Sequence, residues 1–165
     1  MDIRRAILSD AEQISAIYLP IVKDTSISFE TDPPDGDEIA RRISTILATH
    51  EWLVAYDQNG IAGYTYASQY RPRHAYRYAV ETTAYVHERC RGQGVGKSLY
   101  EELFKSLISL DFHVAYAGIS LPNPASVALH RAVGFESIGV FQEAGMKFGK
   151  WHDVSWWQRK LSSSK

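Results

Sequence analysis

The sequence predicts an α+β (mixed α/β) fold, in which helices cover the faces of a central sheet. Runs with strand periodicity and amphipathic helical runs follow one another in the order β-α-α-β-β-β-α-β-α-β-β. Asn59-Gly60, between two apolar runs, is a strong hairpin signal. The 165 residues, 45% of them apolar and with a formal net charge of −1, suffice for one hydrophobic core and not for two.

The first part of the chain predicts a strand, two helices and a hairpin. Residues 3–5 form the strand. Ser9 caps the first helix, with Glu12 completing a capping box, and the second helix begins near residues 35–37. Apolar positions spaced by three and four residues mark the buried faces of these helices: Ile14, Ile17, Tyr18 and Ile21, then Ile39, Ile43, Ile46 and Leu47. Residues 52–56 and 61–69 form the hairpin strands.

The second part predicts three more strands after residues 78–86, with two helices among them. The first of these helices carries apolar residues at spacings of three and four: Val95, Leu99, Leu103, Leu107 and Leu110. A strand at 114–119 follows. Asn123 caps the next helix, Pro124 occupies its first position and Gly134 ends it in a left-handed conformation. Strands at 135–142 and about 153–160 complete the sheet.

The composition excludes several classes of protein. One cysteine, Cys90, rules out an intramolecular disulfide, and with His87 it has no second ligand pair for a metal. No run of ~20 apolar residues predicts a membrane span, and the N-terminus resembles no signal peptide. The near-zero charge disfavours nucleic acid as a partner. We therefore expect a cytoplasmic domain at residues 1–161, with a disordered tail at 162–165.

A glycine-rich segment before the helix at Val95 predicts an anion site. It reads Arg91-Gly92-Gln93-Gly94-Val95-Gly96-Lys97-Ser98. Its exposed amides and the helix dipole suit a pyrophosphate. A Walker loop would need glycine where Arg91 stands, and a dinucleotide fingerprint would need glycine where Lys97 stands, so neither pattern fits. The segment matches Arg/Gln-x-x-Gly-x-Gly/Ala.

That pattern resembles the acetyl-coenzyme A pyrophosphate loop of the GNAT acetyltransferase superfamily. A second GNAT coenzyme motif is similar to Asn123-Pro124-Ala125-Ser126, continued by Leu129-His130 and Gly134-Phe135. More specific blocks resemble the phosphinothricin and methionine sulfoximine N-acetyltransferases: Ser28-Phe29-Glu30-Thr31, Trp52-Leu53-Val54-Ala55, Val80-Glu81-Thr82-Thr83-Ala84-Tyr85-Val86, and Lys147-Phe148-Gly149-Lys150-Trp151-His152-Asp153-Val154 with Trp157-Gln158. The resemblance covers Ile3 to about Arg159. It implies a mostly antiparallel twisted sheet, splayed at the acetyl-CoA site, with helices on both faces.

The resemblance implies transfer of acetyl from acetyl-CoA to an amine within a ternary complex. Glu81 is the candidate base, because burial on an apolar strand would raise its pKa. The backbone of Ala84, Tyr85 and Val86 would pair with the pantetheine arm and polarise the thioester carbonyl. The amides of 91–98 would hold the pyrophosphate, and Asn123 the pantetheine. His130 stands where many GNAT enzymes have a proton-donating tyrosine. It could donate that proton, assist the base or be satisfied in packing.

The acceptor side is also assigned through the resemblance. Amino-acid substrates of the family carry a carboxylate, which Arg71 and Arg73 could bind bidentately. Phe29 and Tyr76 would form apolar walls. We expect a small amino acid or analogue as substrate, acetyl-CoA as co-substrate, no metal and a homodimer. Two alternatives stay open at this point. One is a different acceptor, such as a protein N-terminus, a polyamine or an aminoglycoside; the other is a non-catalytic acyl-CoA sensor.

Overall fold

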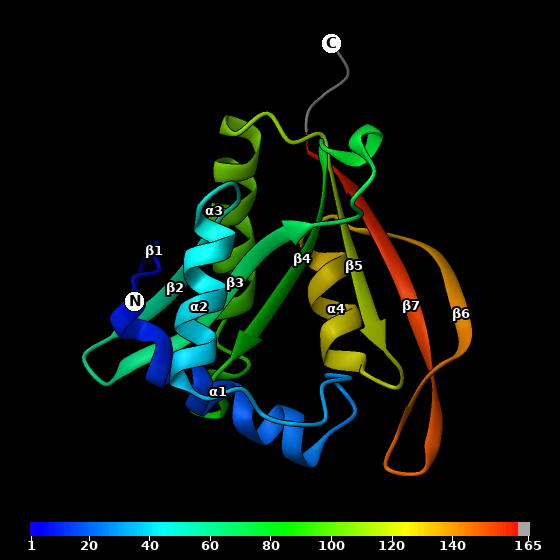
Figure 1. Ribbon diagram of the computed structural model, residues 1–165, viewed down its shortest axis with the longest axis horizontal. Helices are drawn as coiled ribbons and strands as arrows, with labels where there is room; N and C mark the ends of the chain where they lie inside the picture. The colour runs from blue at the N-terminus through cyan, green and yellow to red at the C-terminus, as the bar shows by residue number, and fades with distance from the viewer. Residues whose placement is uncertain (162–165) are drawn as a thin grey trace.

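The computed structural model describes residues 1–161, so the tail expected at 162–165 lies outside the described residues. Its strands form one sheet in the order β1-β2-β3-β4-β5-β7-β6 (Figure 1). The strands are β1 (Asp2–Arg5), β2 (Trp52–Asp57), β3 (Gly60–Gln69), β4 (Ala79–Val86), β5 (Val114–Ser120), β6 (Glu136–Lys147) and β7 (Lys150–Lys160). Every neighbouring pair is antiparallel except β4 and β5. The mixed α+β fold and the mostly antiparallel sheet are confirmed.

Two pairs of helices cover the two faces of this sheet. They are α1 (Ala11–Asp24), α2 (Gly36–Leu47), α3 (Val95–Ser109) and α4 (Pro124–Ala132). Apolar side chains of α1 and α2 pack with Trp52 and Tyr64 on one face. Those of α3 pack on the other face with Val80 and Ala115, and α4 joins them. α2 and α3 lie on opposite sides of the strands (Figure 1). No helix within residues 1–161 is long and apolar enough to cross a membrane.

The sheet opens between β4 and β5, its two parallel strands. They pair through only three residues, ending with Glu81 opposite Tyr116. Beyond this pair, β4 continues against β3 alone and β5 against β7 alone. The peptide groups of β4 after Glu81 are therefore left without a β5 partner. This is the predicted splay, and it creates the site described below.

Most predicted element boundaries are confirmed, and the caps explain why. Asp35 accepts a hydrogen bond from the Glu38 amide at the start of α2, and Asn123 accepts one from the Ser126 amide at the start of α4. Gly134 has φ +85°, as its left-handed position requires.

Three expectations about the elements were wrong. Ser9 does not cap α1; it lies in a 3-10 turn, Leu8–Asp10, and α1 starts at Ala11. There the Asp10 carboxylate accepts from the Ile7 amide and pairs with Arg4 instead. Leu110 follows the end of α3 and is exposed. The last hairpin is longer than predicted, because β6 and β7 extend to a turn at residues 148–149.

Candidate active site

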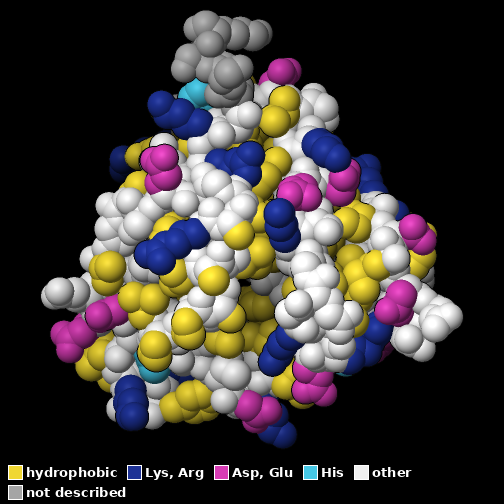
Figure 2. All heavy atoms as spheres, turned by 180° about the vertical axis from the view of Figure 1, so that it is seen from behind, with side chains coloured by type: hydrophobic (Ala, Val, Ile, Leu, Met, Phe, Trp, Pro, Cys, Tyr) yellow, Lys and Arg dark blue, Asp and Glu magenta, His cyan; other side chains and the backbone are white. Residues whose placement is uncertain are grey.

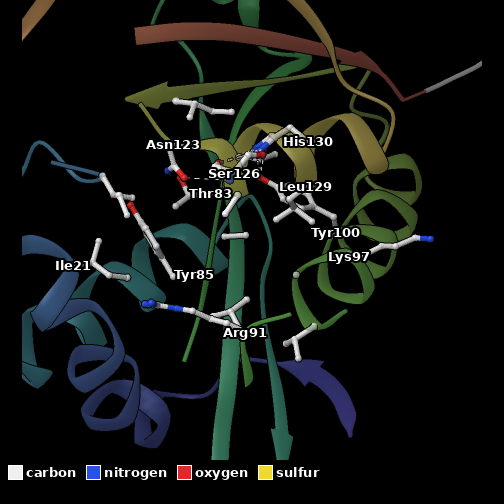
Figure 3. Close-up of a pocket in the computed structure, with 18 of the residues that line it drawn as sticks. Ile21, Thr83, Tyr85, Arg91, Lys97, Tyr100, Asn123, Ser126, Leu129 and His130 are labelled. Carbon is white, nitrogen blue, oxygen red and sulfur yellow. Dashed lines mark hydrogen bonds between the residues drawn. The ribbon is translucent and has the colours of Figure 1, made fainter. Parts of the chain in front are cut away.

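A cavity of about 480 Å³ fills the splay between β4 and β5. From behind, hydrophobic side chains surround a hollow near the centre of the molecule, with Lys and Arg side chains around it (Figure 2). The cavity is lined by residues of β4, β5, the α3 start and α4, among them Thr82–Val86, Arg91, Gly92, Gly94–Lys97, Tyr100, Gly118–Ser120, Asn123, Ser126, Leu129 and His130. Tyr85 and Ile21 lie across it from Tyr100, Leu129 and His130 (Figure 3).

The glycine-rich loop forms one end of this cavity. Gly92 and Gly94 have φ of +72° and +79°, and a Cβ added at either would meet nothing within 4 Å. These positions therefore need glycine for their backbone conformation and stay open to a ligand. The amides at the start of α3 face this end and make it electropositive. Gln93 and Ser98 are not among the lining residues; the Gln93 side chain donates to the Arg89 carbonyl.

The open edge of β4 forms the floor. Ala84, Tyr85 and Val86, the residues expected to contact the pantetheine arm, line the cavity. Tyr85 packs against Tyr18 and Tyr64 on the α1 side, which holds this end of β4 in place. Asn123 lines the opposite wall, although its side-chain oxygen also caps α4. The residues expected at the coenzyme thus come together around one cavity, apart from the side chains of Gln93 and Ser98.

Glu81 is the last residue of β4 that pairs with β5, and it lies between Ser68 of β3 and Tyr116 of β5. Side chains alternate along a strand, so Glu81 faces the α1 and α2 side, while its neighbour Thr82 faces α3. Glu81 is half-buried, and burial raises the pKa of its carboxyl. A carboxylate with a raised pKa at the apex of the splay is equipped to accept a proton.

His130 has both ring nitrogens engaged. Nδ1 lies 2.7 Å from the Ser126 carbonyl oxygen, and Nε2 lies 3.0 Å from the Tyr100 hydroxyl. A carbonyl oxygen only accepts, so Nδ1 carries the hydrogen and neutral Nε2 accepts from Tyr100. Burial lowers the pKa of His130, although the Ser126 bond opposes this shift. The imidazole is therefore neutral at physiological pH.

The candidate acceptor residues lie in two places on the Glu81 side. The Arg71 guanidinium stacks over Tyr70 and Tyr76, at 5.1 and 5.9 Å from their ring centroids. Tyr70 in turn stacks on Tyr116, which pairs with Glu81. Arg71 and Tyr76 thus belong to an aromatic group that reaches Tyr116, the β5 residue paired with Glu81.

The other two acceptor candidates differ in how they are held. Phe29 lies beside the β6–β7 hairpin, 6.2 Å from the His152 ring and against Gly145. Arg73 is exposed and directly precedes a 3-10 turn, His74–Tyr76. The Tyr76 amide donates to the Arg73 carbonyl at 2.9 Å, so Arg71, Arg73 and Tyr76 lie together on one loop, whereas Phe29 lies apart, beside the hairpin.

Comparisons with known proteins agree with this geometry. The model of the GNAT acetyltransferase domain matches residues 3–156. A phosphinothricin N-acetyltransferase of Streptomyces coelicolor is 36% identical, over 98% of this chain and 96% of its own. An L-methionine sulfoximine/L-methionine sulfone acetyltransferase of Pseudomonas paraeruginosa is 34% identical, over 99% and 96%. The chain belongs to the GNAT acetyltransferase family.

Solved structures place the GNAT fold over the whole described chain. A phosphinothricin acetyltransferase from Sinorhizobium meliloti, crystallised with acetyl-CoA, has a TM-score of 0.92 at 40% identity and covers 97% of this chain and 88% of its own. A ribosomal-protein-alanine N-acetyltransferase from Brucella melitensis has a TM-score of 0.93 at 32% identity, covering 97% and 99%. As a GNAT member, the chain is an acetyl-CoA-dependent acyltransferase. Within residues 1–161, no cluster of three or more His, Cys, Asp and Glu could hold a metal.

Several lining residues of this GNAT site, Thr82 and Tyr100 among them, were not predicted from the sequence as site residues. Tyr100 follows Gly96 by one helical turn, so its position on the cavity side of α3 could have been inferred from spacing. The buried Lys147 was also missed. Its Nζ donates to the carbonyls of Val22 and Ser28, at 2.6 and 2.8 Å. Nothing in the local sequence distinguishes this lysine from an exposed one.

Proposed function

We propose that this GNAT enzyme transfers acetyl from acetyl-CoA to the α-amino group of a small amino acid or analogue. The named candidates are phosphinothricin, methionine sulfoximine and methionine sulfone. The observation that carries the proposal is the position of Glu81. It is a half-buried carboxyl of raised pKa at the apex of the splay, one residue from the coenzyme cavity and on the same face of β4 as the lining residues Thr83 and Tyr85. The names of the relatives support the substrate class.

The hydrogen-bond donors that line the cavity suit acetyl-CoA. The amides of the glycine-rich loop and of the α3 start suit the pyrophosphate, with Arg91 and Lys97 alongside. The unpaired edge of β4, from Ala84 to Val86, suits a pantetheine amide, as a further strand would. Asn123 serves the same arm. When bound, acetyl-CoA supplies the activated acyl group, and the β4 amides polarise its carbonyl.

The reaction begins with the acceptor's ammonium group, which has no lone pair and cannot attack the thioester carbonyl. Glu81 removes its proton, directly or through a water, because the raised pKa brings the carboxylate closer to the amine in basicity. The neutral amine forms the C–N bond, and the C–S bond then breaks. The proton taken by Glu81 passes to solvent. The nitrogen loses a second proton after the attack, and this proton neutralises the departing thiolate, so that CoA leaves as the thiol. We propose a positioning role for His130 rather than donation of this proton, as argued in the next subsection.

Acceptor recognition rests on the Glu81 side of the sheet. Arg71 already stacks on the aromatic group that includes Tyr76, and its planar guanidinium can bind a carboxylate bidentately. Arg73 is exposed two residues further along and can complete a second contact. Phe29 provides an apolar surface from the opposite loop. Together these residues favour a zwitterionic acceptor with one further polar group over a polycation.

A second acceptor class is favoured by one observation. The Brucella melitensis structure carries the name of a ribosomal-protein-alanine N-acetyltransferase, and its fold is as similar as that of the phosphinothricin acetyltransferase. A protein N-terminus also presents an α-amino group, so Glu81 could serve it without change. It lacks the free carboxylate that Arg71 and Arg73 are proposed to bind, which is why the free amino acid is preferred.

Release of free CoA tests the proposal. The enzyme is assayed with phosphinothricin, methionine sulfoximine and methionine sulfone, and in parallel with an alanine-ended peptide, spermidine and an aminoglycoside. We expect turnover with at least one amino-acid analogue and a large loss in Glu81→Gln. Turnover of the peptide, spermidine or the aminoglycoside alone would refute the substrate class. Acetyl-CoA binding without turnover of any amine would favour a sensor.

We further propose that the enzyme is a cytoplasmic homodimer of single domains, 1–161, that can confer resistance to a toxic amino-acid analogue. The single buried free cysteine is compatible with a reducing compartment. The terminal hairpin carries exposed apolar side chains that an edge strand rarely leaves uncovered: Ile138, Val140, Phe141, Met146, Phe148 and Trp151. Light scattering of the purified protein should give twice the chain mass. A mass of 18.6 kDa would refute the dimer.

A further inference from the structure

Hydrogen bonds connect four residues that line the coenzyme cavity: Thr82, Tyr100, Ser126 and His130. This chain of hydrogen bonds starts at the Ser126 carbonyl of α4 and passes through His130 to the Tyr100 hydroxyl of α3, at 2.7 and 3.0 Å. Because the Tyr100 hydroxyl gives its one hydrogen to His130, it accepts at Thr82. The single hydrogen of Thr82 Oγ1 is shared between the Tyr100 hydroxyl, at 3.5 Å, and the Tyr116 carbonyl of β5, at 3.3 Å. The four elements that enclose the cavity are thus connected through side chains at one point.

The direction of these bonds removes His130 from the list of proton donors. Its hydrogen is on Nδ1 and points to a carbonyl, while its Nε2 lone pair accepts from Tyr100. Among the groups it contacts, only Tyr100 is titratable; Ser126 and Phe135 carry no charge. Burial lowers the pKa of His130 and raises that of Tyr100, so both are neutral at working pH. The Tyr100 side chain is completely buried, in the wall of the coenzyme cavity.

The hydrogen-bonded residues end at the last pair between β4 and β5. Thr82 follows Glu81 on β4, and Tyr116 is the β5 residue that pairs with Glu81. The Thr82 bond therefore adds a side-chain link at the last paired position, just before the strands separate. A change in this link would alter both the opening of the splay and the orientation of Glu81 toward the thioester.

We propose that His130 is a positioning residue, which acts through Tyr100 and Thr82 to fix the apex of the splay and thereby align acetyl-CoA with Glu81. This inference rests on the proposed acetyl transfer, and it adds Tyr100 and Thr82 as further positioning residues of the same reaction. It assigns no proton transfer to the three residues. Their removal should therefore change the alignment of the reactants and leave the pH dependence of the reaction unaltered.

The test compares Tyr100→Phe, His130→Gln and their double variant with the exposed control Tyr78→Phe. For each, kcat and KM are measured from pH 5.5 to 9, and acetyl-CoA affinity by calorimetry. We expect each single variant to lose about tenfold in kcat, the double variant to lose no more than either single, and all pH profiles to keep the shape of the wild type. The control should match the wild type.

Each alternative has its own outcome. A fall in rate at high pH that disappears in His130→Gln but persists in Tyr100→Phe would make His130 a proton donor and overturn the proposal. If the losses in kcat of the two single variants multiply in the double variant, the two residues act independently, which would also overturn the proposal. Thr82→Val and Thr82→Ser guard against simple misfolding: the serine variant should retain activity and the valine variant should not. Equal activity in the two would refute the chain.

The failure of the proposed function is recognised separately. If the wild type acetylates none of the amines, the same variants are compared in acetyl-CoA affinity alone. The positioning proposal then expects each single variant to bind a few times more weakly, again without additivity. Identical dissociation constants in all four proteins would refute it, whatever the acceptor is.

Discussion

Replacing Lys147 by methionine should loosen the connection between the terminal hairpin and the loop that carries Phe29. Lys147 lies at the end of β6 and is only 5% exposed. Its ammonium donates to the carbonyl of Val22, near the end of α1, and to that of Ser28, next to Phe29. Methionine fills a similar volume but leaves both carbonyls without this donor.

The size of the effect follows from these two bonds. A buried carbonyl that loses its partner costs about 1–3 kcal/mol. Removing the ammonium also removes the cost of burying its charge, which offsets part of the loss. The expected net destabilisation is about 2 kcal/mol, which lowers the Tm of a chain of this size by about 4–8 °C. Because the Ser28 carbonyl adjoins Phe29, KM for the amine should rise several-fold while KM for acetyl-CoA stays unchanged.

Thermal unfolding and steady-state kinetics check this prediction, with Lys150→Met as the matched control. Lys150 lies in the same hairpin and is exposed, so its replacement removes the same charge without a buried hydrogen bond. Lys150→Met should match the wild type in both measurements. If Lys147→Met is as stable as Lys150→Met and keeps the same KM for the amine, the two hydrogen bonds do not support the loop.

Three further predictions concern the base, the acceptor wall and the coenzyme loop. Glu81→Gln should lower kcat by about 10²–10⁴-fold with unchanged acetyl-CoA affinity. Since burial raises the pKa of Glu81, the wild-type rate should fall with decreasing pH at a midpoint above 4.5. A midpoint at or below that value would contradict the assignment of Glu81 as the base. Gly145→Ala would place a Cβ within the ring of Phe29, so KM for the amine should rise with little loss in Tm, and an unchanged KM would exclude Phe29 as an acceptor wall. Gly94→Ala forces φ near +79° on a residue with a side chain, which costs about 1–2 kcal/mol. Calorimetry should therefore show weaker acetyl-CoA binding. Unchanged affinity would mean that the loop does not hold the coenzyme.

The sequence was sufficient for features that depend on local chemistry. Asn123 marks the start of α4 and Gly134 its end, because a helix cap and a left-handed backbone position each select particular residues. The same holds for Gly92 and Gly94 in the coenzyme loop. Ser9 failed as a cap because Arg4 and the Ile7 amide engage the Asp10 carboxylate, an interaction that the capping pattern does not describe.

Features that depend on distant contacts could not be predicted in this way. β7 lies between β5 and β6, an order that no local pattern encodes. β6 is exposed along nearly all of its length, so it lacks the alternation that reveals a half-buried strand. Lys147 is buried because backbone carbonyls more than a hundred residues away accept its hydrogens. The link from His130 to Tyr100 likewise joins residues 30 positions apart.

The alternation of side chains along β4 connects the sequence to the direction of the reaction. Thr82 faces α3, and Glu81 faces the side of the sheet that α1 and α2 cover. In the proposed reaction, Glu81 deprotonates the amine on this side of β4, and the amine meets the thioester in the cavity, which Thr83 and Tyr85 of the same face also line. Because the two strands separate just beyond Glu81, the reacting atoms can meet through the sheet without passing around it. A substitution that restored pairing between β4 and β5 beyond this residue would close that passage, and it should abolish transfer even with Glu81 in place.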